Sequence, residues 1–156
     1  GQGRMPRRLS VQSSVDGGPQ LSPDCRWVAY ASDESGRREI FVRGYPSLED
    51  KHQISMEGGS EPLWNPDRRK RELFYRAGNR MMAVDLTDRG FAEGSAHELF
   101  RGPYVTTLNG FVRPNYDVSP DGQRFMMLKP VEQEPLTRIN VVLSWLEELK
   151  RLVPTK

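Results

Sequence analysis

The sequence predicts an all-β fold built from three consecutive four-stranded units. A Pro-Asp pair occurs three times in the 156 residues, at Pro23, at Pro66, which lies 43 residues later, and at Pro120. Each pair is followed by a short run of aromatic and β-branched residues, which is typical of a strand. A period of about 40–45 residues with this pattern indicates the blades of a β-propeller.

The Pro-Asp pairs are expected to be structural turns that join the first two strands of each unit. Proline fixes φ in such a turn, and the aspartate side chain can bond the backbone that follows it. Gly122 supplies a positive φ, whereas Cys25 and Arg68 stand at that place in the other copies. A positive φ costs a non-glycine residue about 1–2 kcal/mol, so each of these turns either carries that cost or has changed type, and we expect both turns to be distorted. The residues assigned to the turns are Pro23, Asp24, Pro66, Asp67, Pro120, Asp121 and Gly122.

Glycine pairs open the first two units. Gly17 and Gly18 precede the first turn, and Gly58 and Gly59 stand 41 residues further along, so we interpret the two pairs as equivalent loops. Hydrophobic alternation and turn residues predict the strands that follow. These strands lie at 27–31, 39–43 and 51–55, then at 72–75, 81–85 and 97–100, and finally at 124–128 and 138–143, with 8–12 as a remnant of a preceding unit.

The chain is expected to form one domain, 1–156, with units at 13–57, 58–101 and 112–143. A short helix is predicted at 144–153, because Ser144 and Glu147 make a capping box. Leu149 and Val153 belong to its apolar stripe, and Pro154 ends it. We expect this helix to pack against the last blade or a neighbouring subunit.

The first copy of the repeat carries a family resemblance. Its segment 22–24, Ser-Pro-Asp, and its segment 27–36, Trp-Val-Ala-Tyr-Ala-Ser-Asp-Glu-Ser-Gly, resemble the repeat of TolB-like, WD-repeat-like bacterial β-propellers. The other two copies are similar, so the resemblance covers most of residues 15–130. The tail 140–150 resembles that of propellers attached to bacterial serine/threonine kinases, although Ser144 replaces the usual Asn. These signature residues establish a fold and not an activity.

Composition excludes several classes of partner. The net charge is +2, from 23 basic and 21 acidic side chains that are interspersed, so we expect no nucleic-acid partner and no membrane insertion. A lone Cys25 excludes an internal disulfide and leaves both a cytoplasmic and a periplasmic location open. The chain begins with Gly1 and not Met, which indicates a trimmed chain or a piece of a longer protein.

No residue pattern points to catalysis, a metal or a cofactor. Ser60 follows a glycine pair but stands in no Gly-x-Ser-x-Gly motif, and we interpret that segment as a loop. His52 and His97 lie 45 residues apart at equivalent ends of two units, where a surface strand position accounts for them. The basic run 68–71 could bind phosphate, but flanking acidic residues favour a solvated turn. We interpret Trp27, Trp64, Tyr30 and Tyr75 as core between blades.

Three blades cannot close a ring, because closed propellers have about four to eight. Open ends would expose apolar blade faces. Two arrangements remain: a homodimer that joins three and three blades into a six-bladed ring, or the C-terminal half of a longer propeller. The first arrangement requires a symmetric dimer.

The function that this architecture favours is a non-catalytic scaffold that binds a protein or peptide through loops at one face. The preferred contact surface is the long segment 102–115, with Tyr104, Asn109, Phe111 and Arg113, although an ordinary connector explains it equally well. The alternatives are a fragment of a propeller-containing enzyme and the sensor part of a bacterial serine/threonine kinase.

Overall fold

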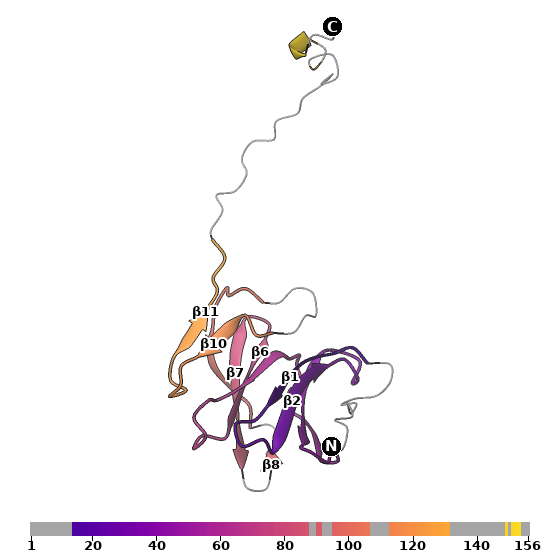
Figure 1. Cartoon of the computed structure of the whole chain (residues 1–156), viewed down its shortest axis with the longest axis vertical. Helices are drawn as coiled ribbons and strands as arrows, with labels where there is room; N and C mark the ends of the chain where they lie inside the picture. The colour runs from indigo at the N-terminus through magenta and orange to yellow at the C-terminus, as the bar shows by residue number, and fades with distance from the viewer. Residues whose placement is uncertain are drawn as a thin grey trace, which may run out of the picture.

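The computed structural model describes residues 14–87, 90–91, 95–106, 113–131, 149 and 151–153, and it is all-β with almost no helix. The first sheet has four antiparallel strands in chain order (Figure 1). They are β1 (Asp16–Leu21), β2 (Trp27–Ser32), β3 (Glu39–Gly44) and β4 (Lys51–Gln53). Side chains on both faces of β2 and β3 are buried, and those on one face pack on the next sheet.

The second sheet repeats this order and adds a two-residue strand. The outer strand β9 pairs with β7, and β8 pairs with the far end of β7. The strands are β5 (Ser60–Trp64), β6 (Glu72–Ala77), β7 (Arg80–Thr87), β8 (Gly90–Phe91) and β9 (His97–Arg101). The strands predicted at 72–75, 81–85 and 97–100 are therefore confirmed, each with slightly different ends.

The third sheet is described for two strands, β10 (Tyr116–Val118) and β11 (Phe125–Met127), which form an antiparallel hairpin. The strand predicted at 124–128 is confirmed as β11. The predicted strand 138–143 lies outside the described residues, as does most of the predicted helix 144–153. Within that helix Leu149, Arg151 and Leu152 are helical, and the Val153 N–H donates to the Leu149 carbonyl at 2.9 Å.

The first and third Pro-Asp turns have the same geometry. In the first, Ser22 Oγ and the Arg26 N–H donate to the Asp24 carboxylate at 2.6 and 3.1 Å, and Cys25 adopts φ 56°. The third turn makes the same bonds from Ser119 and Gln123 to Asp121, and Gly122 has φ 68°. The expected distortion at Cys25 was wrong, because this residue adopts the left-handed conformation that the turn requires.

The second turn has changed type, as its Arg68 suggested. The Asn65 N–H reaches the Glu72 carbonyl at 2.9 Å, so this turn is two residues longer than the first, in which Ser22 bonds Trp27. The Lys70 N–H closes an inner turn onto the Asp67 carbonyl at 2.8 Å. Lengthening the turn removes the positive φ that an arginine would otherwise have to adopt.

The equivalent positions of the first two units are marked by a β-bulge in the first strand of each sheet, and not by the glycine pairs. The register shifts between Gly17 and Gln20 in β1, and between Ser60 and Leu63 in β5. Gly18 and Glu61, each followed by proline, have φ 58° and φ 56° at these bulges. The equivalence that we drew between the two glycine pairs is therefore wrong by two residues, because a glutamate occupies the left-handed position in the second copy.

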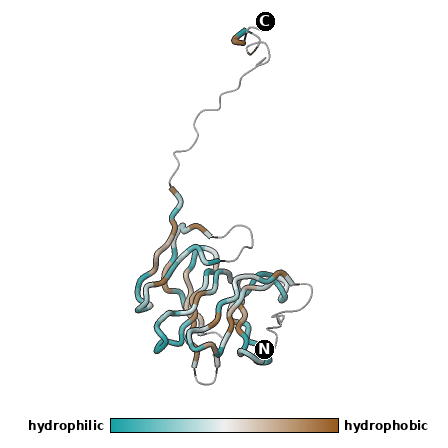
Figure 2. The backbone as a smooth tube through the Cα atoms, in the orientation of Figure 1, coloured by the Kyte–Doolittle hydropathy of each residue, from teal (hydrophilic) through white to brown (hydrophobic). Residues whose placement is uncertain are grey.

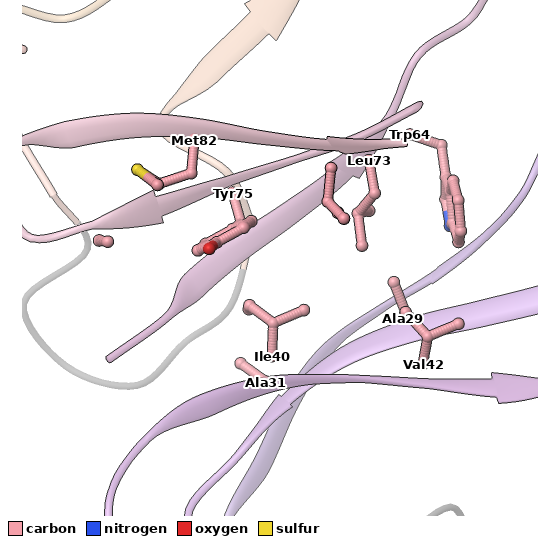
Figure 3. Close-up of a cluster of buried hydrophobic side chains, with 10 residues drawn as sticks. Ala29, Ala31, Ile40, Val42, Trp64, Leu73, Tyr75 and Met82 are labelled. Carbon is pink, nitrogen blue, oxygen red and sulfur yellow. The ribbon is translucent and has the colours of Figure 1, made fainter. Parts of the chain in front are cut away.

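The first two sheets pack face to face. Ala29, Ala31, Ile40 and Val42 from the first sheet point toward Trp64, Leu73, Tyr75 and Met82 from the second, and Ala77 and Val84 complete the cluster (Figure 3). The indole N–H of Trp64 also donates to the Gln20 carbonyl at 2.9 Å, which ties β5 to β1. Trp64 and Tyr75 are thus core between sheets, as predicted, and burial of this cluster stabilises the arrangement of the two sheets.

The opposite face of the second sheet packs on the third. Its cluster consists of Phe74, Met81 and Ala83 with Tyr116 and Val118. Hydrophobic stretches follow the strands, whereas the turns between them are largely hydrophilic (Figure 2). No helix in the described residues is long and apolar enough to cross a membrane.

Candidate functional site

Four loops meet at one end of the sheets, opposite the Pro-Asp turns. They are the hairpin 33–38, the connection 54–59, the turn 78–79 and the described ends of the connection 102–115, and together we call them the connection face. The Gly59 N–H donates to the Arg38 carbonyl at 2.9 Å, and the Gly102 N–H donates to the Asn79 carbonyl at 3.0 Å. Backbone bonds therefore hold each connection against the hairpin of the sheet that precedes it.

A buried carboxylate fixes the first connection. Glu39, at the start of β3, is 2% exposed, and its carboxylate accepts hydrogen bonds from Ser55 Oγ and from the Gly58 N–H at 3.0 Å. Arg37 Nε lies 2.5 Å from the same carboxylate. Ser55 Oγ in turn accepts the Ile40 N–H at 2.8 Å. Because a buried charge is tolerated only with such partners, this network holds 54–59 in one conformation.

A groove of about 620 Å³ opens beside this connection, between β4 and the second sheet. Apolar side chains form its floor, and polar ones, with the exposed Met56, stand at its rim. Arg80 Nη2 bonds Glu57 at 3.2 Å across one end. The lining residues are Lys51, His52, Gln53, Ile54, Ser55, Met56, Glu57, Gly58, Tyr75, Arg80, Met82, Val84, Phe91 and Ala96. Its size and its mixture of an apolar floor with a few polar groups are typical of ligand sites.

Aromatic rings stiffen the wall of this groove. The His52 ring lies 5.8 Å from Trp27 and 5.9 Å from Phe91, and Phe91 also approaches Trp64 at 6.2 Å. Tyr75 lines the groove, where its phenol can donate a hydrogen bond, and burial raises the pKa of this group. His52 is half-buried within an aromatic cluster and not on an open strand surface, whereas His97 is exposed.

A larger cavity, of about 810 Å³, lies between the second and third sheets. Four aromatic rings line it, from Phe74, Phe100, Tyr104 and Phe125, together with the basic run of the second turn. The lining residues are Arg69, Lys70, Arg71, Glu72, Phe74, Asp85, Leu99, Phe100, Tyr104, Gly122, Gln123, Phe125 and Met127. The structure thus brings Tyr104 and the basic run, which are distant in the sequence, to one cavity.

The predicted contact residues of 102–115 separate into different environments. Tyr104 turns inward, with its ring 5.9 Å from Phe100 and the Arg76 guanidinium 5.8 Å from its centre. Arg113 is exposed at the surface. Asn109 and Phe111 lie outside the described residues. The role of this segment in binding stays a prediction.

The remaining candidates have structural roles. A Cβ on Gly59 would lie 2.7 Å from Ile40 Cγ1, so the glycine before Ser60 permits close packing of the connection. The Arg69 guanidinium makes a bidentate pair with Asp67 at 2.9 and 3.0 Å, and this pair lowers the pKa of Asp67. Across the described ranges, no group of three or more His, Cys, Asp or Glu side chains could hold a metal ion.

The sequence reasoning missed Glu61. This residue is buried at the bulge of β5, and its carboxylate accepts the Asn115 N–H at 3.1 Å. Tyr116 Oη donates to the Glu61 carbonyl at 2.8 Å, and burial raises the pKa of this phenol well above its usual value. The Glu-Pro pair that parallels Gly18-Pro19 was the signal that could have identified it.

Comparison with solved structures establishes the fold. The chain is similar to the structure of putative TolB from Agrobacterium tumefaciens, with 21% identity over 80% of this chain and a TM-score of 0.52. TolB from Acinetobacter baumannii gives 16% identity over 85% of this chain, with a TM-score of 0.47. The chain spans 46% and 42% of those two proteins, or less than half of each. No protein-family model and no curated protein matches the sequence. The chain has a TolB-like β-propeller fold.

Proposed function

We propose that this TolB-like propeller chain is a non-catalytic scaffold that binds a protein or peptide at its connection face. The groove beside connection 54–59 is the contact surface, and Arg113 of the segment 102–115 is a further candidate contact. The observation that carries the proposal is the groove itself, an apolar floor between two sheets that a shared core holds rigidly. Recognition commonly occurs at loops on such a scaffold, because the fold positions them at little entropic cost.

The chemistry of the groove favours an extended peptide with one large apolar side chain. Ile54, Met82 and Phe91 offer it an apolar floor, while the nitrogens of the His52 ring in the wall can hydrogen-bond a polar neighbour. The charge of Lys51 is already paired with Glu34 at 2.8 Å. Met56 is 71% exposed at the edge, and a flexible thioether adapts to ligands of different shape. A hydrogen bond from the Tyr75 phenol would orient the bound backbone.

Two other roles remain as alternatives: part of a propeller-containing enzyme, and the sensor part of a bacterial serine/threonine kinase. Both alternatives involve a longer protein, and they are retained because this chain covers 46% of the TolB structure from A. tumefaciens. A propeller chain in either role could use the same groove for recognition. Joining to a catalytic domain would therefore leave the binding proposal unchanged.

Selection from a random peptide library on the immobilised chain tests the proposal, followed by calorimetry on the selected peptide. Met56→Glu places a charge at the groove, and Met126→Glu is a matched control because Met126 is 75% exposed on β11, outside the groove. We expect Met56→Glu to weaken binding about tenfold, which is the typical cost of one lost apolar contact. Equal affinities for both variants would contradict the groove as the contact surface.

A further inference from the structure

The outer edge of β4 is exposed to solvent. This strand pairs with β3 on one side and is the last strand of the first sheet. Lys51 and Gln53 are exposed along it, and among the described residues no strand pairs with its other side. The edge of a sheet presents N–H and C=O groups with which another extended chain can pair.

The backbone of β4 faces β3 at every second residue. The Gly44 N–H donates to the Asp50 carbonyl at 2.9 Å, and the Ile54 N–H donates to the Ile40 carbonyl at 2.8 Å. In an antiparallel pair such bonds recur at alternate residues. The backbone groups of His52, halfway between these two bonds, therefore also point toward β3.

Lys51 and Gln53 have the opposite orientation. They lie across from Arg43 and Phe41 of β3, in pairs that exchange no backbone hydrogen bond, so their N–H and C=O groups point to the open edge. An antiparallel strand placed there can form four backbone hydrogen bonds. The Gln53 side chain donates to the Ser55 carbonyl at 2.9 Å, so the open stretch ends before Ser55.

The groove beside connection 54–59 is in register with this edge. His52 pairs with Val42, which packs in the core against the second sheet. Side chains that lie directly opposite each other in a sheet share a face. A residue of an added strand opposite His52 would therefore direct its side chain toward the second sheet, into the groove that Met82 and Phe91 line.

Two carboxylates precede β4. Glu49 and Asp50 are exposed, and neither carboxylate forms a hydrogen bond or ion pair with the described residues. A Cβ on Gly44 would lie 3.5 Å from Asp50 Oδ2, which places this carboxylate on the same face as His52. In an antiparallel strand, the residue two positions after the one opposite His52 lies opposite Asp50. A basic side chain is favoured at that position.

We propose that an extended peptide adds to β4 as a fifth, antiparallel strand of the first sheet. Its register places a large apolar side chain in the groove and a basic side chain, two residues later, beside Asp50. Backbone bonds to Lys51 and Gln53 supply affinity, whereas the groove and Asp50 select the peptide sequence. This inference rests on the proposed function and specifies how the peptide binds.

Calorimetry on the full chain with N-methylated peptides tests the strand pairing. The probe is the acetylated and amidated heptapeptide Thr-Val-Thr-Phe-Thr-Lys-Thr, whose phenylalanine is designed to lie opposite His52. N-methylation of the threonine on either side of it removes a donor to the Lys51 or Gln53 carbonyl and should weaken binding at least about tenfold. N-methylation of the phenylalanine, whose N–H points away from β4, is the matched control and should have little effect.

A charge exchange tests the register. Replacement of the peptide lysine by glutamate should weaken binding about two- to fivefold, as expected for an exposed ion pair. Asp50→Lys should reverse this preference, so that the glutamate peptide binds better than the lysine peptide. Glu49→Lys makes the same change of net charge one residue away and is expected to have a smaller effect.

The outcomes separate this inference from the proposed function. The same scan is made on the peptide selected from the library. If its binding responds to Met56→Glu but not to the position of the methyl group, strand addition is rejected and the proposed function stands. If no library peptide responds to Met56→Glu, both are rejected.

Two further results would overturn the inference alone. Failure of the heptapeptide to bind at millimolar concentration rejects the stated register. Light scattering identifies a different occupant of the edge. A dimer that Gln53→Pro converts to a monomer means that a second copy of the chain pairs with β4, because proline removes an outward N–H that an edge strand can lose without unfolding.

Discussion

The contact between the first and second sheets and the contact between the second and third sheets differ in the number of buried side chains that the described residues contribute. The first joins two sheets of four and five strands through ten buried side chains, including Ile40, Val42, Leu73 and Tyr75. The second joins a complete sheet to a hairpin through five buried side chains, and an 810 Å³ cavity remains beside them. The same strand, β6, serves both, with Leu73 and Tyr75 on one face and Phe74 on the other.

This difference between the two contacts also distinguishes the groove at the first contact from the cavity at the second. The groove at the first contact lies outside a core that is already filled, so an external ligand can occupy it without competing for space. The cavity at the second contact lies between β9 of the second sheet and β11 of the third, as the groove at the first contact lies between β4 of the first sheet and β6 and β7 of the second. The two hollows therefore occupy equivalent positions. The groove has a complete sheet on each side, whereas the cavity has the hairpin β10–β11 on one side among the described residues.

The largest predicted effect is a core truncation at the first contact. Ile40→Ala should lower the free energy of unfolding by about 2–5 kcal/mol, because the side chain is fully buried. Met127→Ala at the second contact should cost less than half as much if the described contacts are complete. Urea denaturation of both variants measures this. A loss at Met127 equal to that at Ile40 would indicate that a further element covers the third sheet.

The next effect compares the two buried carboxylates of the connection face. Glu39→Gln should cost about 1.5–3 kcal/mol, because Ser55 and the Gly58 N–H lose a charged acceptor. Glu61→Gln weakens the hydrogen bond that the carboxylate accepts from the Asn115 N–H and should cost about 1 kcal/mol. Thermal unfolding of the two variants measures the stability that each substitution removes. A larger loss of stability for Glu61→Gln than for Glu39→Gln would contradict this prediction.

A smaller effect compares equivalent positions of the first and third turns. Gly122→Ala should cost about 2 kcal/mol, because φ is positive and a Cβ would lie 2.3 Å from the Asn65 side chain. Cys25→Gly should stabilise the chain by about 0.5–1 kcal/mol, since release of the left-handed strain exceeds the added chain entropy. Denaturation midpoints measure both. Destabilisation by Cys25→Gly would mean that the first turn is not strained.

The smallest effect is a dependence on pH. Hydrogen bonds from Ser119 and from the Gln123 N–H lower the pKa of Asp121. A folded pKa below the unfolded value of about 3.9 stabilises the fold above that pH, and the contribution is lost as pH falls through the folded pKa. Asp121→Asn should therefore reduce the stability difference between pH 6 and pH 3. An unchanged difference would show that this carboxylate does not contribute.

Much of the fold could be predicted, because short sequence patterns within each repeat indicate its strands and turns. Alternating apolar residues placed the strands, and the Ser-Pro-Asp sequence placed the turns whose bonds Ser22 and Ser119 make. The spacing of Trp64 and Tyr75 indicated core between sheets. The TolB-like fold followed from these features. The number of blades and the homodimer stay predictions.

The site was less predictable, since it depends on contacts between units. Glycine marks a positive φ in the sequence directly, whereas Glu61 and Cys25 adopt one that only their alignment with Gly18 and Gly122 could indicate. The groove joins Lys51 and His52 to Met82 and Phe91, which come from two sheets whose packing no local pattern specifies. Tyr104 was expected at the surface, yet a glycine two residues earlier lets its ring fold back.

The bulge at Glu61 bears on how far the units are interchangeable. In the first unit this left-handed position holds Gly18, which offers no side chain to a neighbour. In the second unit a carboxylate there binds the backbone of Asn115, just before β10. Units of identical sequence could exchange places or shift register along an array. The Glu61 carboxylate of the second unit instead binds the backbone of the unit that follows it. This contact is specific to that pair of units, so the residue with the left-handed backbone helps to fix which unit follows the second one.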